Sequence, residues 1–591
     1  MANEAEISPA EQASIECLDK VFTAISEKRN FRVEAGAGAG KTYTLIKALK
    51  FLIQNFGDEF QKENKKIACI TYTNVAKDEI RSRTDHHPVI FADTIHAFAW
   101  EMMHGFQKAL RERVVQLEGR WPERIDEAGG ITNQTVKYNL GYPKITDTEI
   151  YLHHDDVITI FTSLLYEPKF RKIFASRYPV LLIDEYQDTN KGLADALVAN
   201  FIKVKGDTLI GFFGDHWQKI YGSNTCGLIE ASENELVVIG KEANFRSDRN
   251  IVQVLNRMRP ELPQHEFDPE SGGETLVYHS NNWVGQRRGG GHWAGDLPPT
   301  DAHDYLDWTK LKLEVNGWNI SPETTKVLML THNVLAAEQG YGNVAAAFSN
   351  NDDFLKKNND YIAFLADVVE VGARAFEERK YGEMIEAFKA NTPKIKKQSD
   401  KEIWHTAMAE LQNLRQNGTV GDVIELLKGT QKPRLTKKIA EKEQRFEEIR
   451  TMPVEEREED DNHFFTKMQR IKAIPYPEIT ALVDYLNDKT LYSTKHGVKG
   501  AEFENVIVVL GRGWNHYNWN QLLEWMNAGG PPAGNEDTYE RSRNLFYVAC
   551  SRAKKRLCLL FTQELSANAI TALQVLFSNV ISPAMTDDLH V

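Results

Sequence analysis

Short runs of apolar residues alternate with amphipathic patterns along most of the chain. A buried strand is expected where four or five apolar residues lie between turn residues, and a helix where apolar residues recur three and four positions apart. Regular alternation of the two patterns is typical of βα units built around a parallel sheet. The expected strands form two sets, at residues 31–34, 67–71, 180–184, 209–213 and 236–239 and at residues 275–278, 327–330, 506–509 and 557–561.

The strand pattern fades in two long stretches, where charged amphipathic helices dominate. We therefore predict an α/β protein with two sheet-containing cores, each interrupted by a mainly helical insertion. In this division the first core comprises residues 1–98 and 176–240 and holds the insertion 99–175. The second core comprises residues 241–340 and 485–591 and holds the insertion 341–484.

The second insertion contains a segment of mixed charge. Residues 428–445 carry seven basic and two acidic side chains, and an acidic run follows at residues 455–461. Charge runs of this kind are usually the solvated face of a helix and a loop. A surface that contacts DNA or a partner protein is the alternative.

The overall charge excludes a protein that coats nucleic acid through bulk positive charge. Lysine and arginine number 71 and aspartate and glutamate 84, which gives a formal net charge of −13. Any grip on DNA or RNA must therefore come from local groups. The five cysteines have neither zinc nor iron–sulfur spacing and form no disulfide framework, so we expect no such metal centre and a reducing compartment.

The chain shows no pattern that is typical of membrane insertion or export. No apolar run approaches the ~18 residues of a membrane helix. The first residues lack the basic start and the apolar stretch of a signal peptide. We expect a cytoplasmic protein with no membrane partner.

A phosphate-binding loop is the first chemical motif. The sequence AGAGAGKT follows an expected strand and precedes an expected amphipathic helix, which is the context that a P-loop requires. Backbone N–H groups of such a loop surround phosphates, Lys41 neutralises the β and γ oxygens, and the Thr42 hydroxyl binds Mg²⁺. Alanine at the first position is acceptable if that residue needs no positive φ. The loop comprises Ala35, Gly36, Ala37, Gly38, Ala39, Gly40, Lys41 and Thr42.

A pair of carboxylates supplies the second half of the expected site. Four apolar residues, 180–183, precede Asp184 and Glu185, so the strand delivers both side chains to its carboxyl end, where open parallel sheets bind ligands. Asp184 would hold Mg²⁺, and Glu185 would orient or deprotonate the attacking water. A solvated turn is the alternative for two adjacent carboxylates.

The phosphate loop and eight further motifs, one of which contains the pair Asp184 and Glu185, follow one another in a fixed order. The eight are SPAEQ (8–12), ITYTNVAKDEI (70–80), DTIHAF (93–98), DEYQD (184–188), GDHWQKIY (214–221), NFRS (244–247), STKHGVKGAEF (493–503) and YERSRNLFYVACSRAKKRL (539–557). In this order the chain resembles the superfamily 1A DNA helicases of the UvrD, Rep and PcrA type. The resemblance implies that both cores are RecA-like P-loop domains.

The resemblance also implies roles for residues that are far apart in sequence. Gln12 would contact adenine, Phe245 would stack on it, and Glu502 would accept a hydrogen bond from the ribose. Gln218 would sense the γ-phosphate. Arg246 and Arg552 of the second core would stabilise its charge, since a guanidinium carries a permanent, forked set of donors. The implied catalytic set is Lys41, Asp184, Glu185, Gln218, Arg246 and Arg552, with ATP and Mg²⁺ as cofactors.

A single strand of DNA would cross both cores in this family. Short hydroxyl and amide side chains would hold its phosphates, and aromatic rings would stack on its bases. Tyr72 and Tyr221 are candidate stacking rings, with core packing as the alternative, and His96 could equally be a structural histidine. The implied DNA contacts are Thr71, Tyr72, Thr73, Asn74, Thr94, His96, Tyr221, Thr494 and His496.

Two departures from the family pattern bear on the site. Ser223 and Asn224 stand where the family often has Trp-Arg, so the usual base-stacking platform is missing or is replaced, for example by Trp217. Tyr43 stands where an arginine commonly follows the P-loop, which weakens one expected nucleotide contact.

The resemblance implies an ATP- and Mg²⁺-dependent 3′ to 5′ DNA translocase or helicase that acts on single strands and 3′-tailed duplexes in repair, replication or antiphage defence. The alternative is a DNA-sensing ATPase subunit that regulates a separate nuclease. The compact size and the unusual second insertion resemble the helicase subunits found beside OLD-type nucleases in Gabija-type defence systems. A P-loop kinase or GTPase would leave the last two motifs unexplained.

Overall fold

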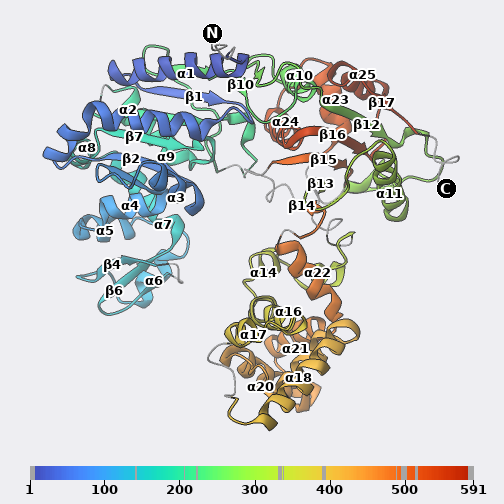
Figure 1. Ribbon diagram of the computed structural model, residues 1–591. Coiled ribbons are helices and arrows are strands. Elements are labelled where there is room, and N and C mark those ends of the chain that lie inside the picture. The colour runs from blue at the N-terminus through green and yellow to red at the C-terminus, as the bar shows by residue number, and fades with distance from the viewer. Residues whose placement is uncertain are drawn as a thin grey trace.

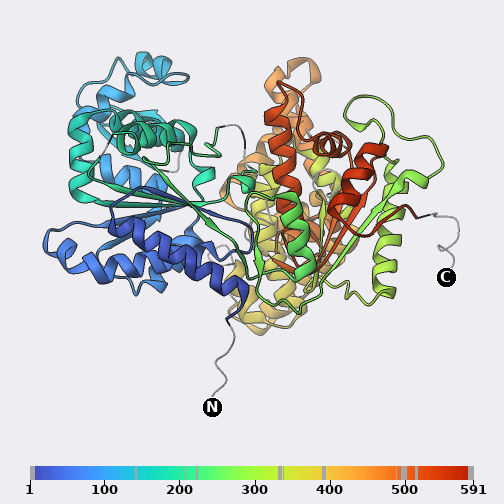
Figure 2. The same ribbon diagram turned by 90° about the horizontal axis from the view of Figure 1, so that it is seen from above.

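The computed structural model describes residues 7–139, 143–204, 206–220, 222, 224–329, 336, 338–388, 395–487, 489–493, 502–512 and 517–583. Two α/β cores lie side by side, and a helical lobe extends from the second core on one side (Figure 1). Seen from above, the strands of both cores run beneath covering helices (Figure 2). The expected fold class, two parallel-sheet cores with mainly helical insertions, is confirmed.

The sheet of the first core has six parallel strands in the order β3-β2-β7-β8-β1-β9. All five strands expected for this core are present. The sixth, β3, was not expected, because only the middle residue of this edge strand is buried and its sequence IFADT lacks an apolar run. The strands are β1 (Phe31–Ala35), β2 (Ile67–Thr71), β3 (Ile90–Thr94), β7 (Val180–Asp184), β8 (Leu209–Gly214) and β9 (Val237–Lys241).

Both faces of this sheet are buried, which explains why its strands are continuously apolar. In β7, Leu182 faces the cluster formed with the first two helices, while Leu181 and Ile183 face the opposite cluster, which continues into the first insertion. The helices of this core are α1 (Pro9–Ser26), α2 (Lys41–Lys62), α3 (Asn74–Arg83), α4 (Ile95–Met103) and α9 (Lys191–Leu197).

The first insertion contains a small sheet that the sequence analysis missed. Its strands are two to four residues long and alternate polar with apolar residues, so they give no run that stands out from loops. The order is β4-β6-β5. The elements are α5 (Gln107–Val114), α6 (Trp121–Glu127), β4 (Thr135–Tyr138), β5 (Lys144–Ile145), β6 (Glu149–Leu152), α7 (His154–Leu165) and α8 (Pro168–Arg177).

The second core repeats the architecture with six parallel strands in the order β14-β13-β15-β16-β12-β17. All four strands expected here are present. The strands are β12 (Glu274–His279), β13 (Thr325–Met329), β14 (Tyr492–Ser493), β15 (Phe503–Leu510), β16 (Ala553–Phe561) and β17 (Val580–Ile581), and the short pair β10 (Ala243–Asn244) and β11 (His265–Glu266) lies beside the first core. The helices are α10 (Arg249–Met258), α11 (Pro299–Val315), α23 (Trp519–Asn527), α24 (Glu536–Cys550) and α25 (Ala567–Leu576).

The second insertion is a helical lobe with its own hydrophobic core, from Ala336 to Val483. Figure 1 shows it extending away from the second core below β14. In the described part of the chain, no helix has the length and apolarity needed to cross a membrane. The helices of the lobe are α13 (Gly342–Ala347), α14 (Asp352–Leu355), α15 (Asp360–Phe364), α16 (Glu370–Glu377), α17 (Tyr381–Phe388), α18 (Gln398–Asn417), α19 (Val420–Thr430), α20 (Lys437–Thr451), α21 (Glu459–Lys472) and α22 (Tyr476–Leu486).

Much of the mixed-charge segment is paired inside this lobe. Lys442 forms an ion pair with Asp360 at 2.5 Å, and Arg445 forms one with Asp461 at 2.8 Å. Lys428 contacts the buried Glu443 at 3.6 Å. These contacts use the charges to hold helices together, which favours the solvated-face interpretation over a free DNA-binding surface.

Candidate active site

The phosphate loop connects β1 to α2 as the sequence predicts. Gly38 and Gly40 have φ of 77° and 73°, a conformation that glycine adopts without steric cost. Ala35 is the buried last residue of β1 and has no positive φ, so alanine is tolerated there. A Cβ on Gly38 would lie 2.7 Å from Asn244 Oδ1, so the loop also approaches the second core too closely for a side chain.

Lys41 at the start of α2 lies against both expected carboxylates. Its Nζ is 3.3 Å from Asp184 Oδ1 and also contacts Glu185 Oε1. Burial alone would lower the pKa of Lys41, but the two carboxylates outweigh it and raise the pKa. Burial raises the pKa of Asp184 in spite of Lys41. The ammonium is thus held where an entering phosphate can replace the carboxylates as its partner.

Glu185 has an unusual backbone conformation for its residue type. Its φ of 49° lies in the left-handed region, which non-glycine residues rarely adopt outside sites that are held by their surroundings. Gln187 Nε2 donates a 2.6 Å hydrogen bond to Glu185 Oε2, and Gln187 is fully buried. Gln187 therefore fixes the direction of the carboxylate that is expected to act on water. The motif DEYQD does not by itself reveal this role of Gln187.

The two expected arginines lie close together in the second core. Arg246 Nε pairs with Glu502 at 2.8 Å and its Nη1 donates to the Ser551 carbonyl at 3.0 Å. Arg552 is 1% exposed, and burial together with the nearby Arg246 lowers its pKa to about 9. An anion beside the two guanidinium groups would relieve both effects, so the pair forms a site for negative charge.

The phosphate loop is hydrogen-bonded directly to the second core. The Phe245 N–H donates to the Gly38 carbonyl at 2.9 Å, and the Asn244 side chain donates to the Ala37 carbonyl at 3.1 Å. In the other direction, the Ala37 N–H donates to the Tyr547 hydroxyl at 3.4 Å. A rearrangement of the loop around phosphates would therefore change these hydrogen bonds to the second core.

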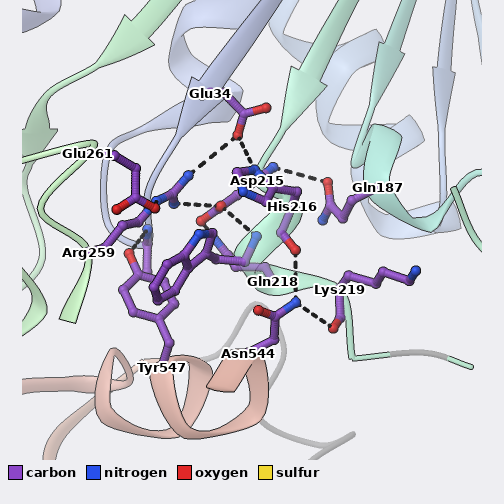
Figure 3. A network of polar contacts seen from close by, with 12 residues as sticks. Glu34, Gln187, Asp215, His216, Gln218, Lys219, Arg259, Glu261, Asn544 and Tyr547 are labelled. Atoms are coloured by element: carbon purple, nitrogen blue, oxygen red, sulfur yellow. Dashed lines mark hydrogen bonds and ion pairs between the residues drawn. The ribbon is translucent and has the colours of Figure 1, made fainter. Parts of the chain in front are cut away.

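A buried polar network around Asp215 joins Gln187 and Glu34 of the first core to Arg259 and Asn544 of the second core (Figure 3). Arg259 Nη1 pairs with Asp215 Oδ1 at 2.6 Å, and both side chains are at most 3% exposed. The other Asp215 oxygen accepts from Gln218 Nε2 at 2.8 Å. The Asp215 N–H donates to Gln187 Oε1 at 3.1 Å. A continuous path thus runs from Glu185 through Gln187 and Asp215 to Arg259, which follows α10.

Glu34 extends this network on its other side. Its Oε2 lies 3.1 Å from His216 Nδ1 and 3.5 Å from Arg259 Nη2, and its Oε1 accepts from Tyr186. Glu34, Asp215 and His216 are close enough to one another to coordinate a metal ion. Arg259 pairs with Asp215, and Arg32 Nε pairs with Glu34 at 2.8 Å, so the arrangement is a buried ion-pair network rather than a metal centre.

Trp217 does not form a base-stacking platform. It is 5% exposed and packs among apolar residues of the second core. The Arg543 guanidinium carbon lies 3.9 Å from the ring centroid and the Arg259 carbon 5.3 Å from it. The suggestion that Trp217 replaces the family platform is therefore wrong, because the ring connects the cores instead of facing solvent.

Three of the expected DNA contacts line one pocket of about 300 Å³. Thr71, Tyr72 and His96 lie there together with Asp155 and Thr159 of the first insertion, which the sequence analysis did not single out. Tyr72 is 48% exposed, which suits a stacking ring. Tyr221, Thr494 and His496 lie outside the described residues.

The other expected contacts lie at helix N-termini. Thr73 caps α3 by accepting from the Ala76 N–H at 3.2 Å, and Asn74 is the first residue of that helix. Thr94 caps α4 in the same way. The hydroxyls thus hold the helix ends, and the N-terminal backbone N–H groups are suited to phosphates.

His96 stacks on His154 of the first insertion, with ring centroids 4.0 Å apart. Burial, assisted by the neighbouring His154, lowers the pKa of His96 to about 4. The ring is therefore neutral near pH 7 and would contact DNA by stacking or hydrogen bonding rather than by charge.

Gln12 lies on α1 and lines a pocket of about 220 Å³ next to the end of β9. Its Nε2 donates to Glu16 Oε1 at 2.9 Å. The capping box formed by Ser8 and Glu11 fixes the start of α1 and therefore the position of Gln12.

Comparisons with known proteins agree with this geometry. The AAA domain family matches residues 19–224, and the UvrD-like helicase C-terminal domain family matches residues 323–564. The chain is 23% identical to the Gabija protein GajB of Bacillus cereus over 93% of this chain and 95% of that protein. It is 24% identical to the ATP-dependent DNA helicase PcrA of Staphylococcus epidermidis over 42% of this chain and 41% of that protein.

The Arg259 network generates a stability prediction. Replacing Arg259 with Gln should lower the free energy of unfolding by about 3 kcal/mol or more, because Asp215 would remain buried without its cation, whereas Glu34 would keep its ion pair with Arg32. Chemical denaturation followed by tryptophan fluorescence measures this change. Arg257→Gln is the matched control, since Arg257 is exposed in the last turn of α10, two residues before Arg259. Equal effects of the two substitutions would contradict the structural role of the network.

Proposed function

Because this chain belongs to the UvrD-like helicases of superfamily 1, we propose that it is an ATP-driven motor that moves 3′ to 5′ along single-stranded DNA. The family membership makes it a helicase-type ATPase. Polarity, the substrate form and the cellular role belong to the proposal. We place its action in DNA repair, replication or antiphage defence.

The observation that carries the proposal is the arrangement of Lys41, Asp184 and Glu185 at the end of β7. Lys41 takes the phosphate charge, and Glu185, held by Gln187, accepts the proton of the attacking water. The Thr42 hydroxyl and the Asp184 carboxylate are oxygen donors of the kind that Mg²⁺ prefers, and the positive φ of Gly38 and Gly40 beside them is the loop conformation whose backbone N–H groups bind phosphates. Bound Mg²⁺ would neutralise charge on the phosphate oxygens.

Coupling to DNA would depend on the second core. Arg246 and Arg552 belong to that core, whereas Lys41 and Glu185 belong to the first. We infer that hydrolysis is fast only when the cores bring both sets to one phosphate. The pocket lined by Thr71, Tyr72 and His96 would sense DNA on the first core.

A second candidate function is a DNA-sensing ATPase subunit that regulates a separate nuclease of the OLD type. The similarity to the Gabija protein GajB over 93% of the chain supports it. The burial of Trp217 supports it as well, because an exposed base-stacking platform is not formed by that ring.

Strand displacement distinguishes the two functions. If the chain is a helicase, it should displace the complementary strand of a 3′-tailed duplex in the presence of ATP and Mg²⁺ and leave a 5′-tailed duplex intact. A gel or fluorescence assay with both substrates measures this. ATP hydrolysis stimulated by single-stranded DNA without any displacement would favour the sensing subunit.

Lys41→Ala should reduce ATP turnover by about a hundredfold or more, because the phosphates lose their buried cation. Binding of single-stranded DNA without nucleotide should persist, since the pocket at Tyr72 is untouched. Steady-state ATPase assays and fluorescence anisotropy measure the two properties. Loss of both would indicate misfolding or a different nucleotide site.

Glu185→Gln should separate ATP binding from hydrolysis. The substitution keeps the shape of the side chain but removes the group that accepts a proton, so turnover should fall by about a hundredfold or more. ATP should still bind, because the ion pair with Asp184 still holds the Lys41 ammonium in place. Equilibrium binding of a fluorescent ATP analogue and single-turnover hydrolysis test this. Turnover equal to that of the unaltered protein would exclude Glu185 as the residue that acts on water.

A further inference from the structure

Gln218, which is expected to sense the γ-phosphate, lies on a short 3₁₀ helix, η3 (His216–Gln218), shortly after β8. The side chain of Asp215 caps the start of this turn. At its end, the Lys219 N–H donates to the His216 carbonyl at 3.3 Å, which is longer than an ordinary backbone hydrogen bond. The end of η3, and with it the direction of Gln218, therefore depends on a further contact.

Asn544 on α24 of the second core supplies this contact (Figure 3). Its Nδ2 donates to the His216 carbonyl at 3.0 Å and to the Lys219 carbonyl at 3.3 Å. The two acceptors lie on either side of Gln218 in the chain, and Asn544 is fully buried. One amide of the second core thus closes the turn that carries Gln218 in the first core.

A neighbouring arginine fixes the orientation of this amide. Arg543 Nε and Nη2 donate to Asn544 Oδ1 at 3.3 and 3.1 Å. A guanidinium cannot accept and a carbonyl cannot donate, so only one orientation of the Asn544 amide satisfies all of these bonds. The Arg543 guanidinium carbon lies 3.9 Å from the ring centroid of Trp217 in η3 and 5.7 Å from that of Tyr539. The arginine is therefore held against the same turn.

The same face of α24 contacts the phosphate loop. Tyr547 follows Asn544 by three residues, so the two side chains lie one turn apart on one face of the helix. The Tyr547 hydroxyl accepts from the Ala37 N–H at 3.4 Å, and Arg552 follows two residues after the end of α24. A movement of α24 would therefore change the surroundings of Gln218, the phosphate loop and Arg552 together.

Helix packing does not explain an asparagine at this position. The next residues of α24, Leu545 and Phe546, are buried apolar residues, as expected for a helix that covers a sheet. A buried amide is destabilising unless its polar groups are paired. Both acceptors of Asn544 Nδ2 belong to the first core, so its hydrogen bonds exist only while α24 lies against η3.

We propose that Asn544 is a positioning residue for ATP hydrolysis, which holds η3 so that Gln218 faces the γ-phosphate only while α24 lies against the first core. The inference rests on the proposed ATPase function. It adds to that function the contact through which the second core controls Gln218. Arg543 supports the role by fixing the direction of the amide.

The competing explanation is that Asn544 only stabilises the boundary between the two cores. The two explanations differ in the step that they affect. Loss of a purely structural contact would loosen α24 as a whole, including the bond from Ala37 to Tyr547, and would weaken ATP binding as well as turnover. Loss of a positioning contact would slow hydrolysis and leave ATP binding by the phosphate loop intact.

Asn544→Asp separates the two explanations. Aspartate has the size of asparagine and still accepts from Arg543, but it cannot donate to the two carbonyls. We expect the kcat of hydrolysis stimulated by single-stranded DNA to fall about tenfold or more, and the Kd of ATP to change less than about twofold. Steady-state ATPase assays give kcat, and equilibrium titration with a fluorescent ATP analogue gives Kd.

Asn281→Asp is the matched control. Asn281 Nδ2 donates to the Leu565 carbonyl at 2.7 Å and its Oδ1 accepts from the Leu565 N–H at 3.0 Å, so this substitution removes a donor that serves the second core alone. Its kcat should equal that of the unaltered protein. Asn544→Leu removes the donor without adding charge and should reproduce the loss seen in Asn544→Asp. Thermal melting sets an assay temperature at which every variant is folded.

A double-mutant cycle with Gln218→Ala tests whether Asn544 acts through Gln218. If it does, adding Asn544→Asp to Gln218→Ala should lower kcat by less than about a further twofold. Additive losses of kcat, a Kd of ATP that rises as much as kcat falls, or an unchanged kcat in Asn544→Asp would each overturn the proposal. An unaltered protein that binds ATP but does not hydrolyse it with DNA present would instead overturn the proposed ATPase function, and the role of Gln218 with it.

Discussion

The buried ion pair between Asp215 and Arg259 is the contact on which the arrangement of the two cores depends. Both side chains are buried, and a buried charge is strongly destabilising without a partner of opposite charge. Asp215 belongs to the first core and Arg259 to the second, so each core supplies the partner of the other's charge. Asp215 also accepts from Gln218 and donates its backbone N–H to Gln187, which in turn holds Glu185. The position of the second core is thereby connected to the carboxylate expected to act on water. A shift of one core would leave charges unpaired, so the boundary favours discrete arrangements over continuous sliding.

Charges around the phosphate loop are arranged to accept an anion. Lys41 lies against two carboxylates, and burial holds Asp184 at a raised pKa. On the other side, Arg552 is buried beside Arg246 at a lowered pKa. An anion beside Arg552 would offset the cost of burying this cation next to Arg246.

The division of the chain into units follows from where apolar surface is shared. The first insertion continues the hydrophobic cluster on one face of the first sheet, so it is attached to the core that carries the pocket of Tyr72 and His96. The second insertion has a separate cluster of its own and uses many of its charges internally. The first insertion and the first core therefore form one hydrophobic unit, whereas the second insertion forms a unit of its own.

The sequence by itself determined the strands and the local chemistry. Buried strands such as 180–184 are continuous apolar runs, and the phosphate loop and the pair Asp184 and Glu185 are contiguous motifs whose geometry follows from the strand before them. The sequence did not predict β3 or the small sheet of the first insertion, because half-exposed or very short strands contain no continuous apolar run. Only the tertiary structure decided that Arg259 pairs with Asp215 and that Trp217 is buried in the second core. These contacts join residues that are distant in the chain. Neither the periodicity of apolar residues nor the spacing of motifs determines which buried charge pairs with which partner.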